Sequence, residues 1–486
     1  MGKPSVHINY RPLCIFAAFF CLGAACAGAY AVPATVLAVT AIVLLICAFF
    51  GYKPGIIACI AVLCGFFRML IAVPEYRYFP ENNHAIHGTI CKTYREQAVI
   101  DEITVDNVHV SGRMLITEKT ELRVGDRIAC TGCISTADRS YSQNYLIASG
   151  IIYTVENTEN LIKTGEHHTL HSSIYSVRYY LHDRIGVIFG DGADIVRAVL
   201  LGESSSVDSS SITALRTAGI AHILALSGLH VTILAKTTEL LLSFMHRKSR
   251  LILSTVLMVL YSAVAGFPVS FVRAVIMLIV RNTAFFVRRR YDALTALGTA
   301  AIVVVCANPY TVFTAGFVLS FGAVLSILLI SRPVTEKLTD DGSSAVKKTA
   351  AQALAASVGI TPLTASVFGH ISLYAIPFNI VCIPIATAAV AAAFTALVTG
   401  LVSVLLSVPF ALVANILFRF IEDAAHVVSM LPFSQLMTGG FSIAAVAAWY
   451  LSEFFISDYF ITEKIIKIYC ATASLVCMTV LFLLGT

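Results

Sequence analysis

Apolar runs that are long enough to cross a bilayer recur along this chain, and they constrain its fold more than any other feature. The hydrocarbon core of a bilayer is about 30 Å thick, and a helix of about 20 apolar residues crosses it. Hydrophobic residues make up 58% of the 486 positions, charged residues make up 13%, and the mean hydropathy is +0.83. Soluble domains contain about 45–50% apolar and about 25% charged residues. The sequence therefore predicts a polytopic α-helical membrane protein.

The apolar runs are separated by short loops in which Lys and Arg gather. They span residues 13–31, 33–50, 54–72, 220–245, 251–266, 270–287, 292–308, 311–331, 349–368, 375–407, 440–456 and 467–485. If 375–407 forms a hairpin or a broken helix pair, every basic loop falls on one side, and the positive-inside rule makes that side cytoplasmic. We therefore expect about 11–13 transmembrane helices, with the N-terminus in the cytoplasm.

Residues 75–157 differ from the rest because apolar and polar residues alternate there, with many β-branched side chains. This pattern predicts about five short strands, enough for a compact all-β barrel of the OB type. Three crossings precede the segment, so we expect it outside the cytoplasm. Its Tyr and Arg residues form no nucleic-acid-binding motif, so a DNA-binding barrel and a β-rich spacer without a ligand stay equally open.

Three cysteines lie in this polar segment, whereas the others lie in apolar runs. Outside the cytoplasm a disulfide is permitted, and Cys91 is the expected partner for either Cys130 or Cys133. Those two would point to opposite faces of a regular strand, which disfavours a bond between them. We expect no metal site among the three thiols.

Polar side chains inside the apolar runs are the candidates for function, because polar groups at membrane depth are costly and usually face a cavity or a partner helix. They are His222, Ser227, His230, Lys236, Glu239, Ser270, Arg273, Gln352, His370 and Asn379. Arg273 is the strongest candidate, since a guanidinium with no acid nearby in sequence needs a distant carboxylate or a phosphate. His230 is equally explained as an imidazole tied to a neighbouring helix, and Ser227 with Gly228 as a close helix contact.

Residues 197–234, RAVLLGESSSVDSSSITALRTAGIAHILALSGLHVTIL, resemble the most characteristic stretch of the ComEC competence family. Further resemblances follow in family order at 261–274, 308–327, 352–373 and 379–384. The resemblance implies an inner-membrane channel for single-stranded DNA in natural transformation, not an enzyme and without a cofactor. It also implies an extracytoplasmic DNA-receptor protein, a cytoplasmic helicase-like motor and a separate nuclease as partners.

Two departures from the family pattern affect these expectations. Val318 stands where the family often has Gln, which weakens any role for that position. Many relatives carry a C-terminal metallo-β-lactamase-like nuclease domain with a His-x-His-x-Asp-His motif, and no such motif occurs in this sequence, so we expect a form without that domain.

The G-x-x-x-x-G-K-[ST] phosphate loop is also absent from this sequence, so we do not expect ATP hydrolysis.

The pattern and the resemblance together predict four parts of the chain. They are N-terminal transmembrane helices at 1–74, the OB-like β domain at 75–157, amphipathic or interfacial helices at 158–219 and the transmembrane channel domain at 220–486. The residues expected to line the channel or the DNA path are Ser227, Gly228, His230, Ser270, Arg273, Gln352 and Asn379.

Two other functions stay open at this point. One is a transporter or export channel for another anionic substrate, because the lining for one polyanion resembles that for another. The second is an intramembrane serine hydrolase built on Ser227 with His222 or His230, since nucleophilic catalysis needs Ser and His within hydrogen-bond reach. Against it, Ala225 stands where a nucleophile elbow would have Gly.

Overall fold

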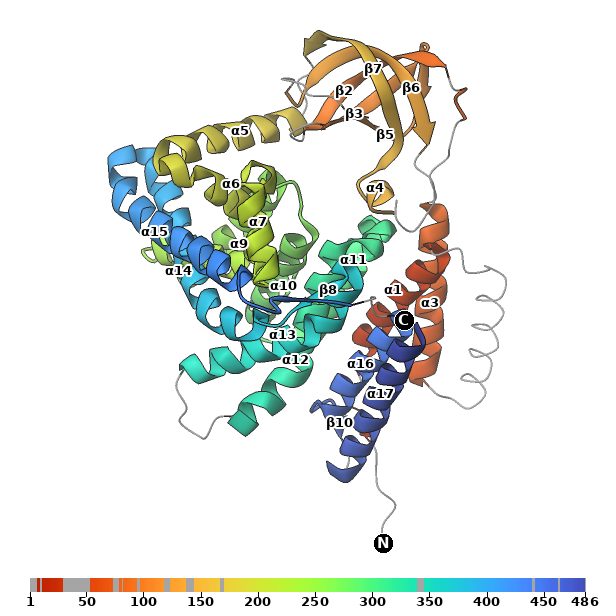
Figure 1. The fold of residues 1–486 in the computed structure, drawn as a ribbon, viewed down its shortest axis with the longest axis vertical. Helices are drawn as coiled ribbons and strands as arrows, with labels where there is room; N and C mark the ends of the chain where they lie inside the picture. The colour runs from red at the N-terminus through yellow and green to blue at the C-terminus, as the bar shows by residue number, and fades with distance from the viewer. Residues whose placement is uncertain are drawn as a thin grey trace.

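A bundle of helices carries a small β barrel at one end (Figure 1). The structure is a computed structural model. It describes residues 7–8, 11–28, 53–72, 78–80, 82–93, 97–117, 123–136, 144–166, 170–338, 345–438, 442–461 and 464–485.

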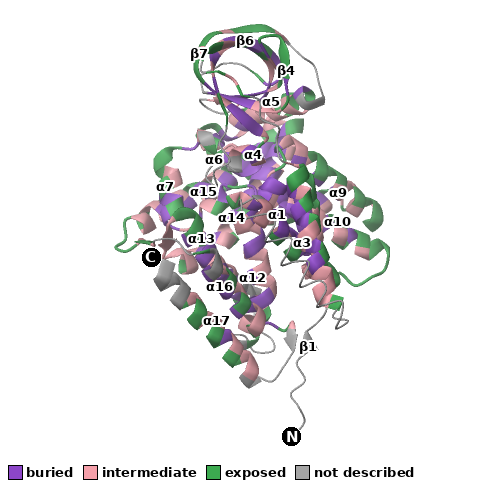
Figure 2. Cartoon of the chain, turned by 90° about the vertical axis from the view of Figure 1, so that its right-hand side faces the viewer, coloured by how far each residue is buried: buried purple, intermediate pink, exposed green. Residues whose placement is uncertain are grey.

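Six strands form the sheet of the barrel. They are β2 (Asn83–Thr93), β3 (Gln97–Val105), β4 (Val108–Val110), β5 (Arg113–Thr117), β6 (Asp126–Thr136) and β7 (Ile151–Glu166). Neighbouring strands are antiparallel except for the parallel pair of β5 and β7. Because β2 pairs with both β3 and β6, the strands β2, β3, β5, β7 and β6 close into a ring, which Figure 2 shows end-on. The predicted small five-stranded barrel is confirmed, with β4 as a short extra strand, and β7 continues past residue 157.

Alternating apolar side chains fill the interior of the barrel, as a strand with one buried face requires. Ile86, Ile100, Ile116 and Ile128 are buried there with at most 1% exposure. A tight turn at Asp106–Asn107, with both φ values positive, joins β3 to β4 in the way a two-residue hairpin does. Burial of these branched side chains is what makes this segment a folded unit.

The disulfide that the sequence permits between Cys91 and either Cys130 or Cys133 is not formed in this structure. Cys130 belongs to the interior cluster of the barrel, whereas Cys91 packs in a separate cluster with Val99 and Leu115. The two side chains therefore lie on different faces of the sheet. Cys133 Sγ instead donates to the Asn83 side-chain oxygen at 3.2 Å.

Two elements attach the barrel to the helices. The short helix α4 (Asn144–Ala148) accepts a 2.6 Å hydrogen bond at the Ala148 carbonyl from Nδ2 of Asn308. The long helix α5 (Leu170–Phe189) starts beside the barrel, where its Tyr179 hydroxyl lies 3.4 Å from Oγ1 of Thr93. The barrel therefore rests on the end of the bundle formed by α5 and the Asn308 loop.

The helical bundle is formed by fourteen further described α-helices. They are α1 (Pro12–Gly28), α3 (Lys53–Ile71), α6 (Ala193–Leu201), α7 (Ser209–Thr217), α8 (Gly228–Leu241), α9 (Arg247–Val264), α10 (Val269–Phe286), α11 (Ala293–Ala307), α12 (Ala315–Leu338), α13 (Ala345–Phe368), α14 (Ala375–Val402), α15 (Val404–Ser429), α16 (Ile443–Ile456) and α17 (Lys464–Gly485). Short 3-10 turns and strands connect them: η2 (Gly190–Gly192), η3 (Ser204–Ser206), η4 (Ala221–Ile223), η5 (Pro309–Phe313), β8 (His370–Ser372) paired with β9 (Gln435–Met437), and β1 (His7–Ile8) paired with β10 (Phe460–Ile461).

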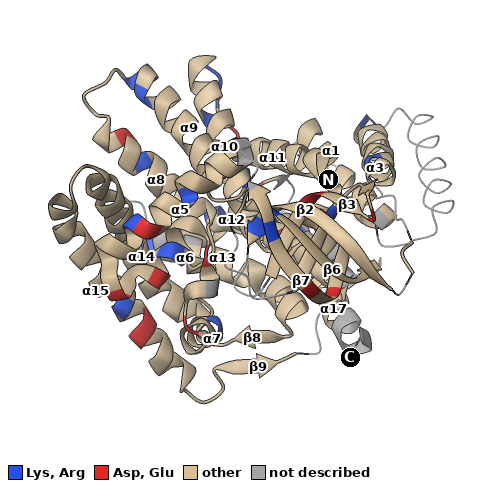
Figure 3. Ribbon diagram, turned by 90° about the horizontal axis from the view of Figure 1, so that it is seen from above, with Lys and Arg blue, Asp and Glu red and all other residues tan. Residues whose placement is uncertain are grey.

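Within the described residues, α3, α10, α12, α14 and α15 are long and apolar enough to cross a membrane. Shorter apolar helices accompany them at Pro12–Ala27, Ala293–Ala307, Ala353–Phe368, Ala445–Ile456 and Ile466–Thr479. The predicted apolar run 33–50 lies outside the described residues. Most of the bundle carries no charged side chain, as Figure 3 shows from above. The prediction of a polytopic helical membrane protein with a small β domain is confirmed.

Two apolar runs fold differently from the sequence-based expectation. Run 220–245 is not one helix, because η4 and an irregular stretch precede α8, whose 14 residues span only about 21 Å. Run 375–407 does not turn in its middle, since α14 continues through Pro384 to Val402. The chain turns at Ser403, whose extended backbone separates α14 from α15.

Contacts of charged side chains join several of the predicted basic loops. These loops lie at the end of the bundle that is away from the barrel. Nη1 of Arg11 lies 2.6 Å from Oδ1 of Asp292, and the Arg11 guanidinium lies 4.7 Å from the centre of the Tyr459 ring. Nε of Arg332 lies 3.4 Å from Oδ2 of Asp458. The start of α1, the loop before α11, the end of α12 and the loop after α16 therefore meet at one end (Figure 1).

Candidate functional site

Arg273 lies in the second turn of α10, and only 5% of its surface is exposed. Among the described residues no carboxylate lies close enough to balance its charge. Its guanidinium lies 5.8 Å from the centre of the Phe321 ring on α12, and its Nε has no acceptor in the part of the chain that the structure describes. A cation over an aromatic face contributes about 2 kcal/mol when desolvated, less than the several kcal/mol that burial of one ion costs. Arg273 therefore carries a charge that is not compensated.

The first residue of α8 lies directly against this guanidinium. A methyl group added to Gly228 would come 2.6 Å from Nη2 of Arg273 and 3.5 Å from Cβ of Ala274. The N-terminus of a helix carries unpaired N–H groups and a partial positive charge. The arrangement therefore places a buried cation beside the positive end of a helix, which is a position that favours an anion.

Ser227 and His230 close the start of α8. The Ser227 backbone N–H donates to Nδ1 of His230 at 3.1 Å, and Ser227 Oγ lies 2.9 Å from the same nitrogen. Because Nδ1 accepts a bond from a backbone N–H, the ring carries its proton on Nε2. That Nε2 is buried and has no partner among the described atoms. His230 is therefore held by its own helix cap, in the manner of a capping box.

Ser270, in the first turn of α10, donates a hydrogen bond from Oγ to the carbonyl of Leu226. This bond ties α10 to the irregular stretch that leads into α8. The structure thus brings together five residues predicted from the sequence: Ser227, Gly228, His230, Ser270 and Arg273. They form one cluster, which we call the α8–α10 site.

The two remaining predicted residues lie on other helices. Asn379 is buried on α14, and its Nδ2 donates to Oγ of Ser357 on α13 at 3.3 Å. Its Oδ1 has no partner among the described atoms. Gln352 belongs to α13, but its side chain is outside the described residues. Neither is joined to the α8–α10 site by a described hydrogen bond.

A second arginine of α10 provides a contrast with Arg273. Nη2 of Arg281 lies 3.8 Å from Oε1 of Glu239 on α8, and the Arg281 side chain is 44% exposed. Lys236, three residues before Glu239 on α8, is exposed. The Glu239 carboxylate therefore pairs with Arg281, which lies two turns along α10 from Arg273.

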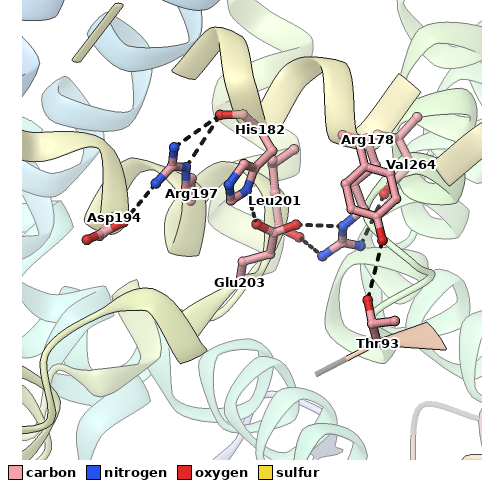
Figure 4. A network of polar contacts seen from close by, with 9 residues as sticks. Thr93, Arg178, His182, Asp194, Arg197, Leu201, Glu203 and Val264 are labelled. Atoms are coloured by element: carbon pink, nitrogen blue, oxygen red, sulfur yellow. Dashed lines mark hydrogen bonds and ion pairs between the residues drawn. The ribbon is translucent and has the colours of Figure 1, made fainter. Parts of the chain in front are cut away.

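Sequence reasoning missed a polar network between α5 and the end of α6 (Figure 4). Nε of Arg178 donates to Oε1 of Glu203 at 2.8 Å, and Nδ1 of His182 lies 2.7 Å from Oε2 of the same carboxylate. Arg178 also donates to the carbonyls of Leu201, at 2.9 Å, and Val264, at 3.3 Å. The network fixes α5, which touches the barrel, to α6 and α9. The sequence signal for it was the acid that follows Gly202, a glycine with φ of +75° at the end of α6.

The described residues contain no group of three His, Cys, Asp or Glu side chains that would hold a metal ion. The α8–α10 site offers donors almost throughout: a guanidinium, helix amides and an imidazole N–H. Such a set suits an anionic ligand and is unsuited to a cation.

Comparison with known proteins identifies relatives of this chain. Residues 199–459, more than half of the chain, match the family described as "Competence protein", and the match includes the α8–α10 site. ComE operon protein 3 of Bacillus subtilis (strain 168) is 31% identical over 199 residues, which cover 40% of this chain and 25% of that protein. The chain thus matches about a quarter of the length of this relative, and no solved structure matches it. The chain belongs to the ComEC family of competence proteins.

Proposed function

We propose that this chain forms a channel in the bacterial inner membrane that passes one strand of DNA into the cell during natural transformation. Membership of the competence family supports a role in DNA uptake. The observation that carries the channel proposal is the buried charge of Arg273, set against the start of α8 with no carboxylate partner among the described residues.

A phosphate of a passing strand is the counter-ion that suits this site. Single-stranded DNA has a negative charge at every nucleotide, and the planar guanidinium binds two oxygens of one phosphate. The first amides of α8 add donors to the same place. A permanent carboxylate beside Arg273 would compete with each phosphate, so its absence among the described residues favours a ligand that arrives and leaves.

The other predicted residues have different parts in this proposal. Ser227, His230 and Ser270 hold the start of α8 next to α10, so they position the guanidinium and the helix amides. Asn379 and Gln352 stay candidates for the DNA path on α14 and α13. Phe321, under the guanidinium, offers an aromatic ring at the same site, and aromatic rings stack with bases in proteins that bind single strands.

The charge distribution supports one orientation in the bilayer. The basic loops meet at the end of the bundle opposite the barrel, and basic loops are retained on the cytoplasmic side. In the proposed orientation the N-terminus is therefore cytoplasmic, and the barrel lies outside the inner membrane. The barrel is then placed to meet incoming DNA before the strand reaches the α8–α10 site.

The proposal includes partner proteins that deliver, pull and process the DNA. An extracytoplasmic DNA-receptor protein would deliver the strand, a cytoplasmic helicase-like motor would pull it, and a separate nuclease would degrade the other strand. These partners follow from the family resemblance, and the lipid bilayer is the remaining partner.

Two alternatives make different predictions. A serine hydrolase is favoured by the 2.9 Å contact between Ser227 and His230, but the Nδ1 of that imidazole already accepts the Ser227 backbone N–H. No described carboxylate orients the ring through Nε2, which the general triad arrangement requires. A serine-reactive probe is therefore expected to leave Ser227 unlabelled. A transporter for another anion would use the same donors, so only an uptake assay separates it from the DNA channel.

Deletion of the gene from a transformable strain, followed by complementation with this chain, tests the proposal. We expect that DNase-resistant uptake of radiolabelled DNA is lost in the deletion strain and restored by the chain. Binding of DNA to the cell surface is the control and is expected to stay unchanged. Normal uptake in the deletion strain would contradict the channel and leave the alternative anion transporter.

A further inference from the structure

A buried acidic side chain, Glu453, lies in the last turn of α16, far along the chain from the α8–α10 site. Only 3% of its surface is exposed. Its Oε1 accepts a 2.9 Å hydrogen bond from Nε1 of Trp449, one turn earlier on the same helix. Its other oxygen, Oε2, is buried and has no partner among the described atoms. An acid in this position was not singled out from the sequence.

Glu453 is enclosed by α12 and α13. A methyl group added to Gly359 of α13 would come 2.9 Å from Oε1 of Glu453 and would clash with Oγ of Ser326 on α12. The Tyr450 hydroxyl donates to the Gly359 carbonyl at 3.2 Å. The Ser326 hydroxyl is also buried and lies beside the Glu453 carboxyl group, close enough to interact with it. A buried carboxyl oxygen and a buried hydroxyl therefore share one helix junction.

Two cations of the surrounding elements are bound to other groups. Nζ of Lys467 on α17 donates to the Ser457 carbonyl at 2.8 Å, and Arg332 on α12 pairs with Glu336 and Asp458. The described titratable or charged side chains on the elements packed around Glu453 are Arg332, Glu336, Lys347, Tyr450, Asp458, Tyr459, Lys467, Tyr469, Cys470 and Cys477. None of the described cations forms an ion pair with Glu453.

An ionised carboxylate here would have no counter-ion among the described residues and would accept only from neutral donors, the Trp449 indole and the Ser326 hydroxyl, so its burial costs several kcal/mol. A protonated carboxyl group avoids this cost. With the proton on Oε2, the group becomes a donor, and Oγ of Ser326 is the neighbouring hydroxyl that can accept this bond. Oε1 continues to accept from Trp449. Acidic residues buried in membrane helices are often proton-binding sites for the same reason.

We propose that Glu453 is a proton-binding site at the junction of α12, α13 and α16, protonated at neutral pH and able to exchange its proton. The exchange takes place at the end of the bundle that carries the basic loops, because Ser457, one turn beyond Glu453, is bound to Lys467 there. This inference does not depend on DNA being the substrate. It assigns to the bundle a titratable group that responds to pH on one side of the membrane.

Trp449 is the sole tryptophan of the chain, so its fluorescence reports directly on the group it binds. We expect the emission of the purified full chain to change as the pH is raised from neutral to alkaline values. Glu453→Gln keeps an acceptor for Trp449 but cannot ionise, so the change is expected to disappear. Glu336→Gln removes an exposed acid on α12 and is expected to leave it intact.

Infrared spectroscopy of the same proteins tests the protonation state independently. We expect a carbonyl band of a protonated carboxyl group at neutral pH that shifts in deuterated water and is missing in Glu453→Gln. Ser326→Ala is expected to shift this band, because the acid loses its acceptor. The proposal is overturned if the band is equal in wild type and Glu453→Gln, if the fluorescence change persists in Glu453→Gln, or if wild-type emission does not change with pH.

Discussion

Gly228 and Arg273 are in such close contact that any side chain at position 228 would displace the guanidinium. The added methyl carbon would lie 2.6 Å from Nη2, well inside normal contact distance. This contact joins the start of α8 to α10 and places the buried charge beside the helix N-terminus. The geometry of the proposed anion site therefore depends on a glycine at this position.

Gly228→Ala is expected to lower DNA uptake by about tenfold or more, which corresponds to a loss of ~1.4 kcal/mol in binding. The arginine side chain is flexible enough to move aside, so the protein is expected to fold. DNase-resistant uptake and protein level on an immunoblot are the two measurements. Gly316→Ala is the matched control, because a methyl group there meets nothing within 4 Å. Equal uptake in the two variants would show that the position of the guanidinium does not matter.

Glu203→Gln is expected to destabilise the attachment of α5, because Arg178 loses its charged partner while staying largely buried. Removing one partner of a buried ion pair costs about 3–5 kcal/mol of stability. The pair of Arg178 and Glu203 is partly exposed, so we expect a cost near the lower end of this range. Thermal aggregation of the detergent-solubilised protein measures the effect. Asp194→Asn is the control, since its pair with Arg197 is half exposed and is expected to contribute at most about 1 kcal/mol. Unchanged stability in Glu203→Gln would contradict the proposed anchoring role.

The barrel contains a hydrogen-bonded pair, His84 and Asp106, whose contribution to stability depends on pH. Nδ1 of His84 lies 2.6 Å from Oδ2 of Asp106, and Asp106 also accepts from the Ala85 N–H at 3.0 Å. The bond to Asp106 raises the pKa of His84 above its ordinary value of 6.5, and the bond to His84 lowers the pKa of Asp106 below its ordinary value of 3.8. The stabilising contribution of His84 is complete below 6.5 and is lost as the pH rises through its pKa in the folded state. The contribution of Asp106 is complete above 3.8 and is lost as the pH falls through its folded pKa.

Protection of the Ala85 amide against hydrogen exchange, corrected for intrinsic rates, is therefore expected to be greatest between these two values and to fall on either side. His84→Gln is expected to remove the fall on the alkaline side. His87→Gln, on the same strand, is expected to leave it unchanged. A protection profile for Ala85 that does not vary with pH would rule out the pair as a contributor.

The barrel thiols are expected to stay reduced and to differ in reactivity. Burial raises the pKa of Cys91 to about 11 from 9.0, so its thiolate fraction at neutral pH is about a hundredfold lower than that of an ordinary thiol. Cys133 is only half-buried. Mass spectrometry of maleimide-treated native protein is expected to find Cys133 labelled well before Cys91. Equal labelling rates, or a disulfide-linked peptide containing Cys91, would contradict the structure.

Patterns of apolar residues in the sequence predicted the β barrel and the membrane helices. The alternation in 75–157 predicted the barrel, and the apolar runs predicted the membrane helices, because burial on one face or in lipid determines both. Apolar content does not reveal where a helix is interrupted, so the break before α8 and the continuous α14 were not predicted.

Contacts between residues that are distant in the sequence were also not predicted. Arg273 was singled out because no acid lies near it in the sequence, but its ring contact with Phe321 on another helix was not predicted. Glu203 and Arg178 are 25 positions apart, and each alone looks like a solvated side chain. Glu453 lies in the last turn of an apolar helix and reads as its polar end, although packing against α12 and α13 buries it.

The measurement that tests the channel most directly is DNA uptake by two arginine variants of the same helix. Arg273→Ala removes the uncompensated charge, whereas Arg281→Ala removes a half-exposed charge that Glu239 balances. With equal protein levels and equal binding of DNA at the cell surface, we predict that Arg273→Ala abolishes DNase-resistant uptake of radiolabelled DNA, that Arg273→Lys restores part of it and that Arg281→Ala keeps it. Wild-type uptake in Arg273→Ala would contradict the account, because a strand would then cross without the buried charge.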